Sequence, residues 1–142
     1  MAAMSYIGID LGTSSVKAVL VDNQQRLLAS ATAELSLHRP QPLWSEQDPA
    51  DWVSATLAAL GRLRDADLPA FRACRGIGLS GQMHGAVLLD DADQPLRPCI
   101  LWNDGRSAAE CAELEAAEPA SRAITGNIAM PGFTAPKLVW VK

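Results

Sequence analysis

The chain has 142 residues, of which 49% are apolar and 20% are charged, and its formal net charge is −4. This composition is typical of a globular domain and excludes an intrinsically disordered chain. The negative charge argues against nucleic acid or an anionic membrane surface as the main partner, and no apolar run is long enough to span a bilayer. The three cysteines form no Cys-x-x-Cys pair, so we expect reduced thiols and a cytoplasmic location.

Three strand candidates open the chain, over residues 6–10, 16–22 and 27–37, separated by short turns at 12–15 and 23–26. Short turns of this kind join antiparallel neighbours. The first two candidates are apolar on both faces, which predicts central strands in a sheet that is covered on each side.

The first of these turns carries the strongest functional signal. Asp10 stands at the end of the first strand, and Gly12, Thr13 and Ser14 follow before the second. Glycine lets the backbone approach a ligand closely, and successive N–H groups in such a turn form an anion site. Because Asp10 would repel a bare phosphate, the pattern predicts a Mg²⁺–nucleotide site in which the carboxylate holds the metal with water and phosphate oxygens. An ordinary hairpin with a glycine- and serine-rich turn is the alternative.

A helix is predicted to begin at Pro49, with Asp48 as its N-cap. Its apolar residues recur at spacings of three and four, which predicts one face packed on the sheet. This stripe comprises Trp52, Val53, Thr56, Leu57, Leu60 and Leu63. A strand candidate over residues 76–80 follows the helix, and the crossover rule predicts that it runs parallel to its neighbour.

The next turn, Gly81 to Gly85, contains Gln82, Met83 and His84. It follows a strand, and ligands gather at the carboxyl ends of strands in open α/β sheets. Glutamine and histidine offer hydrogen-bond donors and acceptors, and methionine offers an apolar wall, a mixture that suits a sugar. A tight turn in which His84 caps a backbone group is the alternative.

Further strand candidates cover residues 86–89 and 98–102. A capping box, Ser107 with Glu110, is predicted to open a helix that ends before Pro119. Since Ser107 is already predicted to cap this helix, the charged residues before it, Asp104 and Arg106, are not needed as caps.

Two interpretations of those charges, Asp104 and Arg106, stay open. They form either an ion pair beside the sugar pocket, with Trp102 as a hydrophobic wall, or an exposed pair worth about 0–1 kcal/mol. For Trp44, core packing is the preferred interpretation.

The last segment, residues 134–142, begins like a helix, with Thr134 as a cap candidate and Pro136 in the first turn. No glycine or asparagine closes it. We therefore expect a fragment of a longer protein.

Two of these motifs resemble a known family. Asp10-Leu11-Gly12-Thr13-Ser14-x-x-Lys17 is similar to the first phosphate motif of the carbohydrate kinases that share the actin and Hsp70 nucleotide-binding fold, and the Walker and Rossmann fingerprints are absent. Gln82-Met83-His84-Gly85 resembles the xylulokinase branch of the FGGY carbohydrate kinases, in which the Met-His pair contacts the ketose. The segments 44–49, 101–106 and 125–138 extend the resemblance over nearly the whole chain.

The resemblance implies an α/β fold of the ribonuclease H-like, actin/Hsp70 type. Its mixed sheet has three antiparallel strands followed by parallel strands, with flanking helices, and the order of the elements above agrees. Residues 1–142 would then be an incomplete N-terminal FGGY kinase domain, with the C-terminal domain absent.

The implied reaction is transfer of the γ-phosphoryl group of ATP, with Mg²⁺, to D-xylulose, giving D-xylulose 5-phosphate. The resemblance implies that Asp10 organises the metal and that the phosphate is bound by Gly12, Thr13, Ser14 and Lys17, although a solvated Lys17 is an equal alternative. The sugar contacts would come from Gln82, Met83, His84, Asp104 and Arg106. The general base would lie beyond residue 142, so the fragment alone is expected to be inactive, and the full-length protein could form a homodimer. The alternatives are another FGGY kinase acting on ribulose, gluconate or glycerol, an Hsp70- or actin-like nucleotide-binding module, and a sugar-binding regulator.

Overall fold

The computed structural model describes residues 4–142, which form two compact units. Unit 1 comprises residues 4–36 and 50–82, and unit 2 comprises residues 37–49 and 83–142. Within residues 4–142, no helix is both long enough and apolar enough to cross a membrane.

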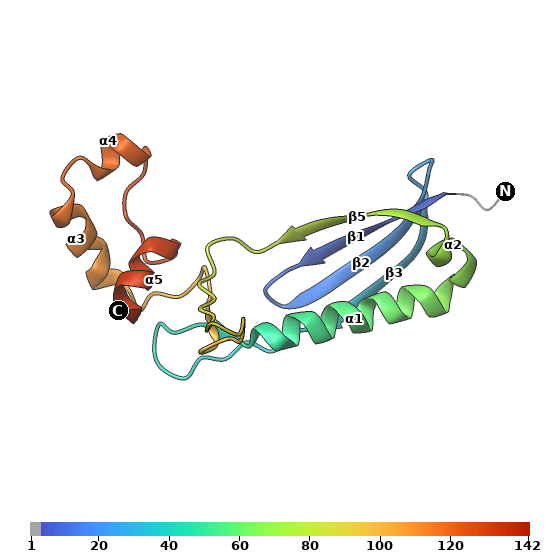
Figure 1. Ribbon diagram of the computed structural model, residues 1–142, viewed down its shortest axis with the longest axis horizontal. Coiled ribbons are helices and arrows are strands. Elements are labelled where there is room, and N and C mark those ends of the chain that lie inside the picture. The colour runs from blue at the N-terminus through green and yellow to red at the C-terminus, as the bar shows by residue number, and fades with distance from the viewer. Residues whose placement is uncertain (1–3) are drawn as a thin grey trace. The chain divides into compact units, whose positions relative to one another are not determined.

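Unit 1 is built on a four-stranded sheet in the order β3-β2-β1-β5 (Figure 1). β1 (Ser5–Leu11), β2 (Ser15–Asp22) and β3 (Leu27–Glu34) pair antiparallel in succession, and β5 (Cys74–Gly81) pairs parallel to β1. The short connections force the antiparallel pairs, whereas the path to β5 passes through helices and returns parallel. The predicted strand order is therefore confirmed, although β3 ends three residues earlier than expected.

Helix α1 (Pro49–Ala66) begins where predicted and covers one face of this sheet, and the short helix α2 (Leu68–Arg72) follows it (Figure 1). The face of α1 that packs on the sheet matches the predicted stripe only in part: Leu63 is buried and Leu60 packs against the core. Val53 and Leu57, in contrast, are 61% and 63% exposed. The buried residues of the helix are two alanines and a leucine at four-residue spacing, Ala55, Ala59 and Leu63. Small side chains let the helix approach the sheet closely. The core comprises Ile7, Ile9, Val16, Ala18, Leu20, Ala31, Ala33, Ala55, Ala59 and Leu63.

The opposite face of the sheet stays open among the described residues. Side chains alternate along β1, so Ile7 and Ile9 are buried while Tyr6 and Asp10 are exposed. β1 and β2 are central, as predicted, but the expectation that both faces are covered is wrong for residues 4–142. This open face carries Asp10, at the end of β1.

Unit 2 has little regular strand. β4 (Glu46–Gln47) pairs antiparallel with β6 (Cys99–Ile100), and three helices follow: α3 (Ala108–Ala117), α4 (Ser121–Thr125) and α5 (Thr134–Val141) (Figure 1). The strand predicted over residues 86–89 is wrong, because only isolated bridges form there. The strand predicted over 98–102 is reduced to two residues. Prolines at 95 and 98 lack the N–H that a ladder needs.

Two predicted helix caps are also wrong. Ser107 precedes α3 as predicted, but its side chain makes no cap; its Oγ donates to the carbonyl of Pro131 over 3.3 Å. The N-cap of α5 is Phe133, and Thr134 is the first helical residue. A tertiary contact thus uses the Ser107 hydroxyl group that the local pattern assigned to capping.

Candidate functional site

The turn between β1 and β2 is held tightly by hydrogen bonds. The N–H of Gly12 donates to the carbonyl of Ser15 over 3.0 Å, and the carbonyl of Ser14 accepts from Leu35 N–H over 2.9 Å. A Cβ on Gly12 would lie 3.2 Å from the Ser15 oxygen, a tight contact that favours glycine here. Since the Gly12 N–H is used inside the turn, Gly12 contributes shape to an anion site rather than a donor.

Gln82 lies beside this turn. Its N–H donates to the carbonyl of Leu11 over 3.0 Å, and its Oε1 accepts from the Thr13 hydroxyl over 3.3 Å. The parallel pairing of β1 with β5 brings these residues together, because the carboxyl ends of both strands meet at one edge of the sheet. The sequence predicted that Gln82 contacts the sugar together with Met83 and His84. In the structure Gln82 also contacts the turn that is predicted to bind phosphate.

Asp10 and Lys17 face each other across the β1–β2 pair. Both side chains are exposed, on the open face of the sheet, and both line a shallow depression of about 340 Å³ together with Gly8, Val19 and residues of β5. Directly opposed side chains in an antiparallel pair are close enough to interact. Lys17 can therefore offset the charge of Asp10 where a phosphate would approach.

The donor set in this region fits a metal that is shared with a ligand. Within residues 4–142, no group of three or more His, Cys, Asp or Glu side chains could enclose an ion. Asp10 offers a carboxylate beside the turn. Mg²⁺ is commonly held in this way, by one or two carboxylates, water and substrate phosphates, rather than by a cage of protein ligands.

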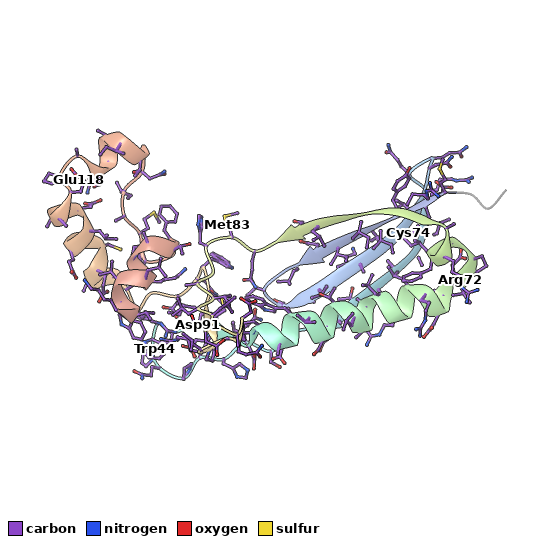
Figure 2. The ribbon with its side chains drawn as sticks, viewed as in Figure 1. Trp44, Arg72, Cys74, Met83, Asp91 and Glu118 are labelled. Atoms are coloured by element: carbon purple, nitrogen blue, oxygen red, sulfur yellow. The ribbon has the colours of Figure 1, made fainter. Side chains whose placement is uncertain are left out.

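The sugar motif continues into unit 2, where Met83 and His84 begin the next turn. Met83 is 67% exposed (Figure 2), and His84 is also exposed. The backbone of His84 has φ +61°, a left-handed conformation that is uncommon for residues other than glycine. Its ring contacts Phe133, with 4.8 Å between ring centroids. His84 also lines a mostly apolar cavity of about 610 Å³ among α3, α4 and α5.

A buried lysine donates a hydrogen bond to the backbone of this turn. Lys137, on α5, has no exposed surface, and its Nζ donates to the carbonyls of His84 and Gly132 over 2.7 Å each. Burial lowers the pKa of Lys137, while the charge of Asp104 opposes that shift. A Cβ on Gly132 would lie 2.6 Å from the Trp102 carbonyl oxygen, so this segment also depends on glycine.

Asp104 and Arg106 form a buried ion pair, which excludes the exposed alternative. Their side chains are 0% and 1% exposed, and Nη2 of Arg106 lies 2.7 Å from Oδ2 of Asp104. Asp104 also accepts from the backbone N–H groups of Ser45, over 2.6 Å, and Arg106, over 2.9 Å. Glu46 joins the pair, with its Oε1 2.7 Å from Nη1 of Arg106.

Two tryptophans complete this network. The guanidinium of Arg106 lies 3.7 Å from the ring centroid of Trp44 and 5.0 Å from that of Trp140, and the two indoles meet edge to face. The predicted packing role of Trp44 is thus confirmed, whereas Trp102 is 47% exposed. Burial alone would raise the pKa of Asp104, but hydrogen bonds from Arg106 and from backbone N–H groups hold it below its ordinary value.

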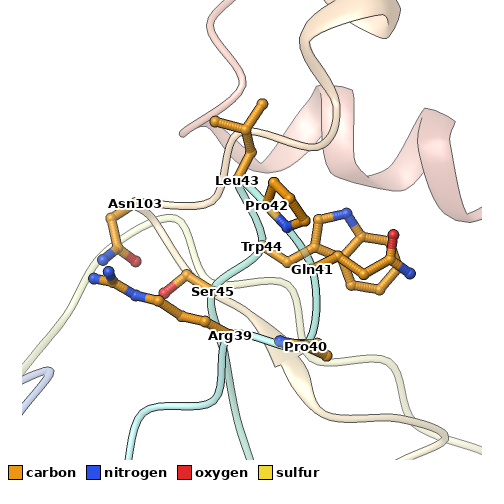
Figure 3. Close-up of a pocket in the computed structure, with 8 residues that line it drawn as sticks. All are labelled: Arg39, Pro40, Gln41, Pro42, Leu43, Trp44, Ser45 and Asn103. Carbon is orange, nitrogen blue, oxygen red and sulfur yellow. The ribbon is translucent and has the colours of Figure 1, made fainter.

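The Asp104 and Arg106 side chains have almost no exposed surface through which to contact a sugar. The acceptor oxygens of Asp104 are occupied by Arg106 and Ser45, so the pair shapes the loops that carry it. Trp44 and Ser45 also line a separate pocket of about 610 Å³, formed by residues 39–45 and Asn103 (Figure 3). None of the residues that the sequence assigned to phosphate or sugar binding lines this pocket.

The FGGY family of carbohydrate kinases, N-terminal domain, matches residues 5–142. The chain belongs to this family.

Relatives within the family agree over almost the whole chain. A xylulose kinase from Klebsiella pneumoniae is 58% identical over 96% of this chain, and one from Escherichia coli is 56% identical over the same share. A solved structure of a "xyloylose kinase" from Brucella ovis is 62% identical, with a TM-score of 0.92 over 96% of this chain and 29% of that one. The chain spans about 28% of the length of the first two relatives.

The likeness to these FGGY kinases confirms the predicted ribonuclease H-like fold class. Sequence reasoning nevertheless missed Glu46 and Trp140 as partners of Arg106, and Lys137 as the hydrogen-bond donor to His84. A signal for Lys137 was present, because it stands between apolar residues in the short helix Thr134–Val141, where a cation needs buried partners.

Proposed function

We propose that the full protein containing this domain transfers the γ-phosphoryl group of ATP to a hydroxyl group of D-xylulose and releases D-xylulose 5-phosphate and ADP. The observation that carries the proposal is the 58% identity to a xylulose kinase over 96% of this chain. A glycerol kinase from Chelativorans is 36% identical over 95% of this chain, so another sugar remains the second candidate.

In the proposed mechanism, unit 1 supplies the phosphate half of the site. Thr13 and Ser14 lie at the tip of a turn that Gly12, Leu35 and Gln82 hold in place, so its geometry does not have to be formed when the nucleotide binds. Lys17 offsets the negative charge of Asp10 where phosphate oxygens approach. Phosphoryl transfer depends mainly on such positioning and charge neutralisation.

Asp10 is the proposed carboxylate for Mg²⁺. When bound, the ion supplies charge neutralisation on the phosphate oxygens. The exposed carboxylate, at the tip of β1 and beside the turn, supports this role. Because no group of three or more ligand side chains is found among residues 4–142, the metal is expected to bind with the nucleotide rather than before it.

Gln82, the last residue of unit 1, is a proposed sugar contact, and so are Met83 and His84, both in unit 2. Both side chains are exposed and chemically suited to a polyol, one as an apolar wall and one as a hydrogen-bonding group. For Asp104 and Arg106 we propose a positioning role, because both side chains are buried and paired with each other. The attacking sugar oxygen forms the new bond to phosphorus as the bond to the ADP oxygen breaks.

The hydroxyl proton must pass to a general base, which we place beyond residue 142 on the strength of the family resemblance. The domain alone is therefore expected to be inactive. All three cysteines, at positions 74, 99 and 111, are free thiols, which supports a reducing, cytoplasmic setting.

The test is a substrate panel on the full-length protein, with ADP release measured for D-xylulose, D-ribulose, gluconate and glycerol. The proposal expects the largest kcat/KM for D-xylulose. A larger value for glycerol or gluconate would favour another member of the family, and no sugar-dependent turnover would exclude a kinase of these sugars.

A further inference from the structure

Lys137 is a charged side chain in a position where packing alone would favour an apolar one. It is completely buried on α5, and its ammonium group is held by the carbonyls of His84 and Gly132. Removing an ammonium group from water is costly unless it is hydrogen-bonded and near a compensating charge. The Asp104 carboxylate supplies such a charge, since it raises the lysine's proton affinity against the effect of burial.

One of its two acceptors is the residue proposed to contact the sugar. The carbonyl of His84 accepts from Lys137 over 2.7 Å, so the lysine fixes the peptide plane that follows the imidazole-bearing residue. His84 needs such a restraint, because φ +61° is a left-handed conformation that is strained in a residue with a Cβ. Without the hydrogen bond to its carbonyl, His84 would lose a contact that stabilises this left-handed conformation.

The second acceptor links the lysine to the other restraint on His84. Lys137 holds the Gly132 carbonyl, and the next residue, Phe133, packs its ring on the imidazole of His84. One ammonium group therefore fixes both the backbone of the turn and the segment that carries the ring beside it. The position of the imidazole depends on both contacts.

We propose that Lys137 is a positioning residue for sugar binding, which clamps the His84 carbonyl and the Gly132–Phe133 segment so that the imidazole is presented to the sugar in one orientation. The inference rests on the proposed function, because it needs His84 to contact the acceptor. It assigns Lys137 no contact with the sugar or with ATP.

The experiment compares steady-state kinetics of the full-length enzyme with the variants Lys137→Met, Lys137→Arg, His84→Ala and the double variant Lys137→Met/His84→Ala. Lys142→Met is the matched control, since it removes an exposed ammonium group from the end of the same helix. Each variant is measured for its KM for D-xylulose, its KM for ATP, its kcat and its melting temperature.

The expected result is a KM for D-xylulose raised by about tenfold or more in Lys137→Met, with the ATP KM and kcat changed by less than about twofold. Lys137→Arg should recover part of this loss, and Lys142→Met should match the wild type. In the His84→Ala background, Lys137→Met should have no further effect on the sugar KM, because the clamp acts through His84.

Two outcomes would overturn the inference. A lower melting temperature with an unchanged sugar KM would show a purely structural lysine, and additive effects in the double variant would show that it acts independently of His84. Should Lys137→Met not fold, Lys137→Gln, which keeps two N–H donors on a shorter side chain, is measured in its place. If neither folds, Lys137 serves the fold and the inference is wrong. An inactive wild type, or a His84→Ala variant with normal sugar KM, would instead refute the proposed function.

Discussion

Replacing Asp104 with asparagine removes the negative charge from the buried network but keeps the size of the side chain. The carboxylate accepts from Ser45 N–H and from three nitrogen atoms of Arg106. An asparagine offers one acceptor oxygen, and its amide group turns N–H donors toward the guanidinium. Part of the Arg106 charge then has no acceptor on this side.

The loss can be estimated from the burial and the remaining partner. Breaking a buried ion pair by removing one member costs about 3–5 kcal/mol, because the other charge is left uncompensated. The lower end applies here, about 3 kcal/mol, since Glu46 remains 2.7 Å from Nη1 of Arg106 and the indole of Trp44 still covers the guanidinium.

The assay is urea denaturation of the full-length protein and of the Asp104→Asn variant, with unfolding monitored by circular dichroism. Asp65→Asn is the control, because Asp65 pairs with Arg64 and both side chains are more than half exposed, at 70% and 56%. The control should unfold like the wild type, as exposed pairs contribute little. An Asp104→Asn variant as stable as this control would refute the assigned role of the pair.

Three further predictions concern stability and reactivity. Gly132→Ala should destabilise the protein by about 1–3 kcal/mol in urea melts, because a Cβ would lie 2.6 Å from the Trp102 oxygen. Gly61→Ala, in α1 and with no atom within 4 Å, should stabilise it by about 0.5–1 kcal/mol; equal effects would contradict both assignments. Because the pKa of Asp104 is lowered from 3.8, its contribution to stability should be constant above about pH 4 and disappear as the pH falls further, so wild type and Asp104→Asn should converge in acid melts. Burial raises the pKa of Cys99 to about 11, so iodoacetamide at pH 8 should leave it unmodified in peptide maps of the native protein, and rapid labelling would show that it is accessible.

The parts of the fold that the sequence predicted are those set by local patterns. The turn after Asp10 is short enough to force an antiparallel pair, and Pro49 after Asp48 starts α1 at the expected residue. The predicted packing face of α1 was only partly right, because apolarity was taken as a guide to burial: Leu63 packs on the core as predicted. Ala55 and Ala59 pack on the sheet because they are small, while larger Leu57 faces outward.

The candidate site shows the same division between local and distant contacts. The turn containing Thr13 is visible in the sequence, but its hydrogen bond to Gln82 joins residues 69 positions apart. The partners of Arg106 are similarly distant, since Glu46 comes from another loop and Trp140 from α5. No spacing rule connects such residues, so the buried network could only be seen in the folded chain.

The most direct test of the central claim is a comparison of Asp10→Ala with His84→Ala in the full-length enzyme, with D-xylulose and ATP as substrates. If Asp10 serves the phosphate half, its variant should lose about a hundredfold or more in kcat with an unchanged melting temperature, because an exposed carboxylate contributes little to the fold. His84→Ala should raise the KM for D-xylulose and leave the KM for ATP unchanged. Near-normal turnover by Asp10→Ala, or an equal rise in both KM values for His84→Ala, would contradict the division of the site into a phosphate half and a sugar half.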